Sequence, residues 1–214
     1  GRDIEITERG AKRNVQASRD PLTEVEALMS AYRPQGQGPV PVFHGGAVGY
    51  LAYDMVRFFE PTLPEPPPDQ LGLPDMVFLI TDVVLVFDHR HRKLFVVANV
   101  HTTEHDSLQA AYDWAGEQIR SVIAKLEAPL QAKPLQTFAP VTDASMPAPV
   151  GNATREEYEA MVEKAKEYIR AGDIFQVVPS QRFEVPYEGT AVDLFRALRH
   201  VKPSPYMFCI ELPQ

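Results

Sequence analysis

The residues best placed to do chemistry lie in the last quarter of the chain. Gln176 carries an uncharged amide within residues 174–185, whose dense apolar side chains predict a strand. A buried amide must find hydrogen-bond partners, because leaving it unpaired costs about 1–3 kcal/mol. We interpret Gln176 as a candidate functional amide. The alternative is a core glutamine that its neighbours satisfy.

A second candidate is the segment 203–208, which reads Pro-Ser-Pro-Tyr-Met-Phe. Its two prolines restrict the backbone and present Tyr206 and Met207 in a defined conformation. An aromatic ring and a thioether suit a small apolar ligand, and they equally suit the packing of a core. The residue pattern leaves both interpretations open.

Other polar patterns favour structural roles. The glycine-rich residues 45–50 lack the lysine of a phosphate-binding loop and the helix start of a dinucleotide site, so they indicate close packing within a sheet. His89 and His91 flank Arg90, and no further ligand completes a metal set, so we expect a solvated turn. The glutamates of residues 156–167 are expected on a solvated helix face.

Composition excludes several classes of function. The formal net charge of −8 argues against a general surface for nucleic acid or anionic membranes. No apolar stretch approaches the roughly 18 residues of a membrane span. The single cysteine, Cys209, lies in an apolar run, so we expect a buried, inert thiol in a reducing cytoplasm.

The elements that position these residues mix strands and helices without βαβ alternation, which favours an α+β fold. Asp20 and Pro21 predict a helix start, and Thr154 and Glu157 form a capping box for a helix that ends at Gly172. Further helices are expected after Thr103 or Asp106 and at 191–200, and strands at 40–48, 49–53, 76–87, 93–100, 174–185 and 206–212, with 76–87 and 93–100 forming a hairpin.

Residues 129–153 are rich in proline and alanine and have no period, which indicates a linker. We therefore expect an N-terminal domain at 1–128 and the start of a second domain at 154–214.

Several of these segments resemble a known family. The run 172–180, Gly-Asp-Ile-Phe-Gln-Val-Val-Pro-Ser, and the segment 203–208 are similar to signatures of the chorismate-utilising enzymes, and within them to those of anthranilate synthase component I, the large chorismate-binding subunit. Residues 44–54 and 74–89 resemble the N-terminal domain of the same subunit. The resemblance runs from about Asp20 to the last residue. It implies that family's α+β fold, with mixed or antiparallel sheets and packed helices, in a truncated form.

The resemblance also implies a reaction. These cytoplasmic lyases add ammonia to C2 of chorismate and eliminate pyruvate to give anthranilate, for tryptophan biosynthesis. A glutaminase subunit, component II, supplies the ammonia, and Mg²⁺ binds the chorismate carboxylate. The family's metal-binding glutamates belong to a later part of its catalytic domain, so no residue here is assigned to the metal. We expect an N-terminal fragment with an incomplete catalytic domain, inactive alone.

Within this resemblance Gln176 matches the family's catalytic amide. Water-adding relatives hold a lysine base at this position, whereas ammonia already has a free lone pair and needs no base. Pro205, Tyr206 and Met207 match the segment through which L-tryptophan inhibits the enzyme. Two departures from the family bear on that inhibition: Lys202 stands where it usually has asparagine, and its other feedback segment would precede Gly1.

Three alternatives remain at this stage. One is a structural or interaction protein that matches these segments by chance. Aminodeoxychorismate synthase component I, of the folate pathway, shares the fold and the glutamine, although the residues 177–180 that follow Gln176 resemble the anthranilate branch more closely. A non-catalytic amino-acid-sensing module with this fold is a rival of a different class.

Overall fold

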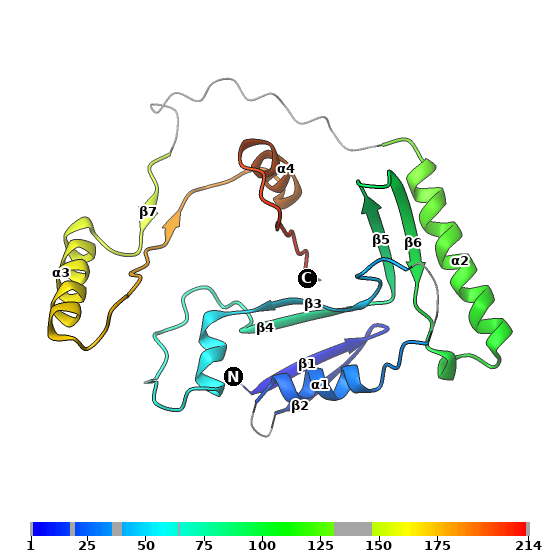
Figure 1. Ribbon diagram of the computed structural model, residues 1–214, viewed down its shortest axis with the longest axis horizontal. Helices are drawn as coiled ribbons and strands as arrows, with labels where there is room; N and C mark the ends of the chain where they lie inside the picture. Colours follow the sequence, from blue (N-terminus) through cyan, green and yellow to red (C-terminus); the bar gives the residue numbers. More distant parts are fainter. Residues whose placement is uncertain (1, 18–19, 36–39, 64, 131–146, 213–214) are drawn as a thin grey trace. The chain divides into compact units, whose positions relative to one another are not determined.

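The computed structural model describes residues 2–17, 20–35, 40–63, 65–130 and 147–212. The chain forms two compact units, Gly1–Leu130 and Gln131–Gln214. Figure 1 shows that each unit combines helices with antiparallel strands, and the described strands pair two by two in four sheets. The α+β class predicted from the sequence is confirmed. The linker expected at 129–153 falls largely on 131–146, outside the described residues, and the roles given to 1–128 and 154–214 stay predictions.

The first hairpin joins β1 (Asp3–Glu8) to β2 (Ala11–Gln16), a pair that the sequence analysis did not predict. Its turn consists of Arg9 and Gly10, both with positive φ (51° and 81°), the geometry that matches the twist of two-residue hairpins. Helix α1 (Leu22–Ser30) follows. Oδ1 of Asp20 accepts a hydrogen bond from the backbone N–H of Leu22 (2.9 Å), so the predicted helix start is confirmed.

Four strands form two further hairpin-like pairs: β3 (Gly46–Leu51) with β4 (Met76–Thr81), and β5 (Val83–Asp88) with β6 (Lys93–Ala98). The prediction of a single strand over 76–87 is wrong. Asp82 separates β4 from β5, and these two strands pair with different partners. The expected hairpin is confirmed only for its second half. Residues 40–45 form no strand, so the prediction for 40–48 holds only from Gly46.

Helix α2 (Leu108–Glu127) packs against β6 and buries Ala111. Its N-cap is Ser107, whose hydroxyl accepts a hydrogen bond from Ala110 N at 3.1 Å. The sequence analysis predicted Thr103 or Asp106 as the cap, which is wrong by four residues for Thr103 and by one for Asp106. Two 3-10 helices complete the unit, η1 (Tyr53–Phe58) and η2 (Thr102–Glu104).

The second unit contains β7 (Val150–Gly151), α3 (Arg155–Ala171), β8 (Phe183–Glu184) and α4 (Ala191–Val201). The capping box of α3 is confirmed: Thr154 Oγ1 accepts from Glu157 N (3.1 Å) and Glu157 Oε2 accepts from Thr154 N (2.8 Å). Gly172 ends the helix with a φ of 80°, as predicted.

Two predicted strands of this unit are wrong. Of 174–185 only Phe183 and Glu184 form a strand, and 206–212 forms none. Apolar, β-branched composition favours an extended backbone, but a strand also needs a partner whose N–H and C=O groups complete the ladder. Within the described residues, β7 supplies such a partner only to β8.

Complete burial is rare in this chain. Of the described hydrophobic residues only Ala17, Met55 and Ala111 are fully buried. Cys209 is exposed, which corrects the expected buried thiol. The elements are therefore held mainly by their own hydrogen bonds, by caps and by partly buried faces, and local backbone geometry has a large share in their stability.

Two glycines of the first unit test how far its stability depends on local backbone geometry. Replacing them by alanine should change the free energy of unfolding in opposite directions. A Cβ at Gly49 in β3 would overlap the backbone carbonyl of Val77 in β4, whereas a Cβ at Gly116 in α2 would meet only the flexible end of Arg120. We expect Gly49→Ala to lower the free energy of unfolding by about 1–3 kcal/mol, and Gly116→Ala to raise it by about 0.5–1 kcal/mol. Urea unfolding followed by the fluorescence of Trp114, the chain's single tryptophan, measures both. A neutral Gly49→Ala variant would contradict the close approach of β3 and β4.

Candidate functional site

The segment with the candidate amide is set by the end of α3. Gly172 takes the left-handed conformation, and the N–H of Asp173 donates to the carbonyl of Tyr168 at 3.0 Å. This closure turns the chain back, so the following residues run in the reverse direction toward the start of the helix (Figure 1).

The returning segment, residues 173–184, is held by hydrogen bonds at its far end. Its side chains and backbone bond to α3 and to the residues just before it, and β8 then pairs with β7. The contacts are Tyr158 Oη to Pro179 O (3.4 Å), Gln181 Nε2 to Ala153 O (2.6 Å), Arg182 N to Asn152 Oδ1 (2.9 Å) and Asn152 N to Arg182 O (3.0 Å). Residues 174–178 form the unfastened stretch between the two ends.

Gln176 lies in this unfastened stretch. It is exposed and belongs to no strand, and among the described residues its side chain has no hydrogen-bond partner. Its neighbours Phe175 and Val178 are 93% and 78% exposed. The expected buried amide on a strand is thus corrected: the side chain of Gln176 is exposed and lies outside any described strand.

The second candidate segment follows α4. The helix ends at Lys202, and the N–H of Tyr206 donates to Oγ of Ser204 at 3.4 Å. Pro205 and Tyr206 are exposed, Tyr206 by 90%, and Met207 is half-buried. Among the described residues, no hydrogen bond or ion pair connects this segment to residues 174–178, the stretch that contains Gln176.

A polar junction in the first unit escaped the sequence analysis. Asn99 lies just after β6. Its side-chain amide donates to the backbone carbonyls of His44 (2.6 Å) and Asp82 (3.2 Å). Its backbone N–H also donates to the carbonyl of Asp82, at 2.7 Å. Nε2 of His101 lies 3.0 Å from Oδ1 of Asp82. The signal in the sequence was Asp82, the one charged residue inside the largely apolar run 76–87.

Tyr32 completes this junction from the end of α1. Its ring packs edge-on against His101 with 4.7 Å between centroids. Burial, followed by the negative charges of Asp82 and Glu8, raises the pKa of Tyr32 above its ordinary value. Tyr32 borders an open hollow of about 410 Å³ between β1, β2, α1 and η2. The junction connects α1 with three other segments. Its polar groups form their hydrogen bonds and ring contacts mainly with one another.

The turn between β5 and β6 contains His89 and His91, and both are exposed, as predicted. Asp88 holds the turn: its Oδ1 accepts from His91 N at 2.9 Å, and its Oδ2 lies 2.7 Å from Nδ1 of His91. These two hydrogen bonds, the backbone one first, lower the pKa of the Asp88 carboxyl.

Metal ligands do not gather in the described part of the chain, where no three His, Cys, Asp or Glu side chains could hold an ion together. Of the helices searched in the same part of the chain, none is long and apolar enough to cross a membrane.

Known proteins resemble this chain over nearly its whole length. The family model described as chorismate binding enzyme matches residues 2–214. Anthranilate synthase component 1 of Pseudomonas putida is 35% identical over 97% of this chain and 41% of that protein. The protein of the same name from Aquifex aeolicus is 36% identical over 98% and 41%, and the one from Cereibacter sphaeroides is 42% identical over 88% and 37%.

A solved structure agrees with the sequence comparisons. Anthranilate synthase component I from Streptococcus pneumoniae superposes with a TM-score of 0.74 at 29% identity, over 95% of this chain and 44% of that chain. The chain thus spans 41% of the length of the first two relatives.

The Asn99 junction gives a testable consequence. Asn99→Ala leaves the carbonyl of His44 without its donor, so we expect the free energy of unfolding of the first unit to fall by about 1–3 kcal/mol. Asn14→Ala on the exposed face of β2 is the control, with an expected change within about 0.5 kcal/mol. Trp114 fluorescence during urea unfolding measures both variants, and equal midpoints would contradict a structural role for the junction.

Proposed function

The chain belongs to the family of chorismate-binding enzymes, and from this premise we propose that it is part of the large subunit of an anthranilate synthase. The observation that carries the proposal is its superposition on anthranilate synthase component I over 95% of its residues. Curated relatives with the same name, similar over nearly the whole chain, support it.

The proposed reaction of the whole protein is a lyase reaction. The lone pair of ammonia attacks C2 of chorismate and the C4 hydroxyl departs as water. Elimination of the enolpyruvyl group as pyruvate then leaves the aromatic ring of anthranilate. A glutaminase subunit, component II, would release the ammonia from glutamine in the cytoplasm. The described residues offer no Mg²⁺ site, so no step is assigned to a metal here.

Gln176 is the proposed active-site residue of this chain. Its exposed and unpaired amide can donate to and accept from a bound ligand. A neutral amide would position the substrate and leave ammonia unprotonated, whereas a base at the same place would activate water. The fixed ends of the returning segment limit the positions that this amide can reach.

Pro205, Tyr206 and Met207 are the proposed binding segment for L-tryptophan as a feedback inhibitor. The exposed ring of Tyr206 and the thioether of Met207 offer the apolar surface that an indole requires. The two prolines restrict the conformations of the segment, which reduces the entropy lost on binding.

Replacing the proposed positioning residue tests the reaction. We expect Gln176→Lys in the whole protein, with chorismate and ammonium supplied, to lower kcat/KM for anthranilate formation on the order of 10²-fold. Gln109→Lys on the exposed face of α2 introduces the same charge away from the site and should leave the rate unchanged. Fluorescence of anthranilate gives the rate.

Chromatography of the products extends this test. A water-derived product such as isochorismate from Gln176→Lys would support an amide placed beside C2, because a structural role alone would not change the nucleophile. Formation of 4-amino-4-deoxychorismate by the unaltered protein would contradict the anthranilate branch. Equal rates for the two glutamine variants would overturn the role of Gln176.

Feedback inhibition has its own test. We expect Met207→Ala to raise the tryptophan concentration for half-inhibition of the whole protein roughly tenfold, about 1.4 kcal/mol of binding free energy. Met161→Ala on α3 removes the same side chain from a partly exposed helix face and serves as the control. Identical inhibition curves for both variants would reject the assignment.

A further inference from the structure

The turn between β5 and β6 concentrates positive charge in an acidic chain. Arg90, Arg92 and Lys93 supply three of the 21 lysines and arginines within four residues, while the chain has a net charge of −8. All three side chains are exposed, and none forms an ion pair with another described residue. This cluster, together with His89, is called the basic turn below.

The carboxylate next to the basic turn, that of Asp88, forms no ion pair with its three cations. Both oxygens of Asp88 are directed to His91, one to its backbone N–H and one to its imidazole. Asp88 lies directly across the ladder from Lys93, yet it makes no ion pair with it. The acid thus fixes the shape of the turn, and the charges of Arg90, Arg92 and Lys93 stay available.

One cation occupies a position where another residue would be more favourable. Arg92 has a φ of 52°, a left-handed conformation that glycine or asparagine adopts at lower cost. This conformation carries backbone strain whichever role the side chain has. An arginine here favours the interpretation that the charge itself is used.

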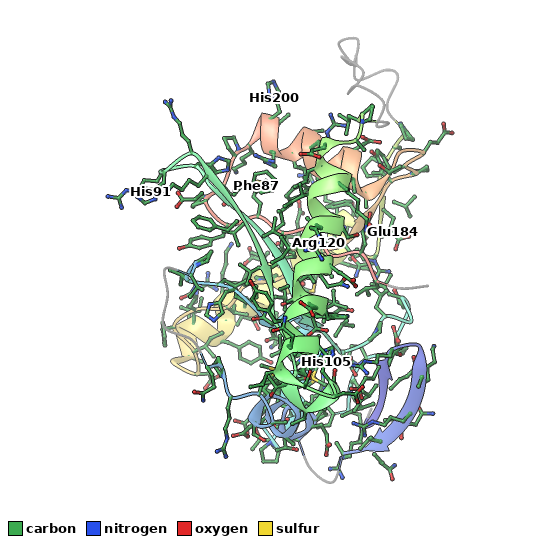
Figure 2. All side chains as sticks on the ribbon, turned by 90° about the vertical axis from the view of Figure 1, so that its right-hand side faces the viewer. Phe87, His91, His105, Arg120, Glu184 and His200 are labelled. Atoms are coloured by element: carbon green, nitrogen blue, oxygen red, sulfur yellow. The ribbon has the colours of Figure 1, made fainter. Side chains whose placement is uncertain are left out.

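Apolar side chains adjoin the basic turn. Phe87 and Leu94 face each other across the ladder and are 59% and 44% exposed. Together with Asp88, His89, Arg92 and Lys93 they line an open hollow of about 320 Å³. Figure 2 shows Phe87 and His91 at the turn end of the hairpin. An exposed aromatic residue beside arginines is the composition found at the centres of protein interfaces.

We propose that the basic turn and the Phe87–Leu94 pair form a docking site for an acidic, amphipathic segment of another protein. Carboxylates of the partner would pair with Arg90, Arg92 and Lys93, and an apolar side chain would cover Phe87. Nucleic acids and anionic membranes fit less well, because they engage wider basic surfaces than three cations and the surrounding chain is acidic. The site lies outside the segments proposed for chorismate and tryptophan.

A binding experiment with the whole protein tests this site. The probe is a fluorescein-labelled peptide with phenylalanines flanked by glutamates, followed by fluorescence anisotropy. We expect Arg90→Glu with Lys93→Glu to weaken binding roughly tenfold. The control, Arg120→Glu with Lys125→Glu on α2 (Figure 2 marks Arg120), changes the net charge equally and should leave affinity within about twofold.

Two further peptides and two other probes complete the design. Replacing the peptide's phenylalanines by serine, or its glutamates by glutamine, should weaken binding, and Phe87→Ser should match the first change. No binding of the peptide, or equal loss in both double variants, would overturn the proposal. Tighter, turn-dependent binding of duplex DNA or of phosphatidylserine vesicles would also overturn it, because the partner would then belong to another class. Trp114 fluorescence confirms that each variant is folded.

Discussion

The first unit depends on one amide, that of Asn99. The two hairpin-like pairs, β3 with β4 and β5 with β6, belong to different sheets and are joined in sequence only through Asp82. Asn99 bonds to the carbonyl of Asp82 and to that of His44, just before β3, so a single side chain connects the beginning of one sheet to the end of the other. Gly45 fits this place because a Cβ there would overlap the Asn99 amide. His101 and Tyr32 extend the junction to α1.

Local rules predicted the parts of this fold that depend on local interactions. The capping box of Thr154, the left-handed Gly172 and the start of α1 at Asp20 each involve residues within a few positions of one another, and all three are confirmed. The strands at 174–185 and 206–212 were wrong because a strand exists only with its partner, and composition does not name the partner. The hairpin β1–β2 was missed because its strands are largely polar, although the pair Arg9-Gly10 was a turn signal.

The family was predictable from the sequence, but the environment of the candidate residue Gln176 was not. The motif around Gln176 indicated the family, which the comparisons establish. The expectation of burial came from its apolar neighbours, and it was wrong because those neighbours are themselves exposed. Apolar sequence predicts which side chains gain from being covered, but only packing determines which are covered. The amide of Gln176 is therefore placed by the hydrogen bonds at the two ends of its segment, from Gly172 to Arg182, and not by a surrounding core.

The first unit has two kinds of polar cluster, one whose groups bond to one another and one whose charges face solvent. At the Asn99 junction, donors and acceptors satisfy one another, and the pKa of Tyr32 is raised largely because its ring is partly covered; such groups hold structure. At the basic turn, the single acid is used for the turn and three cations face solvent, with one of them in a backbone conformation unfavourable for arginine. The proposed partner of opposite charge is argued from these exposed cations, which form no ion pair with another described residue.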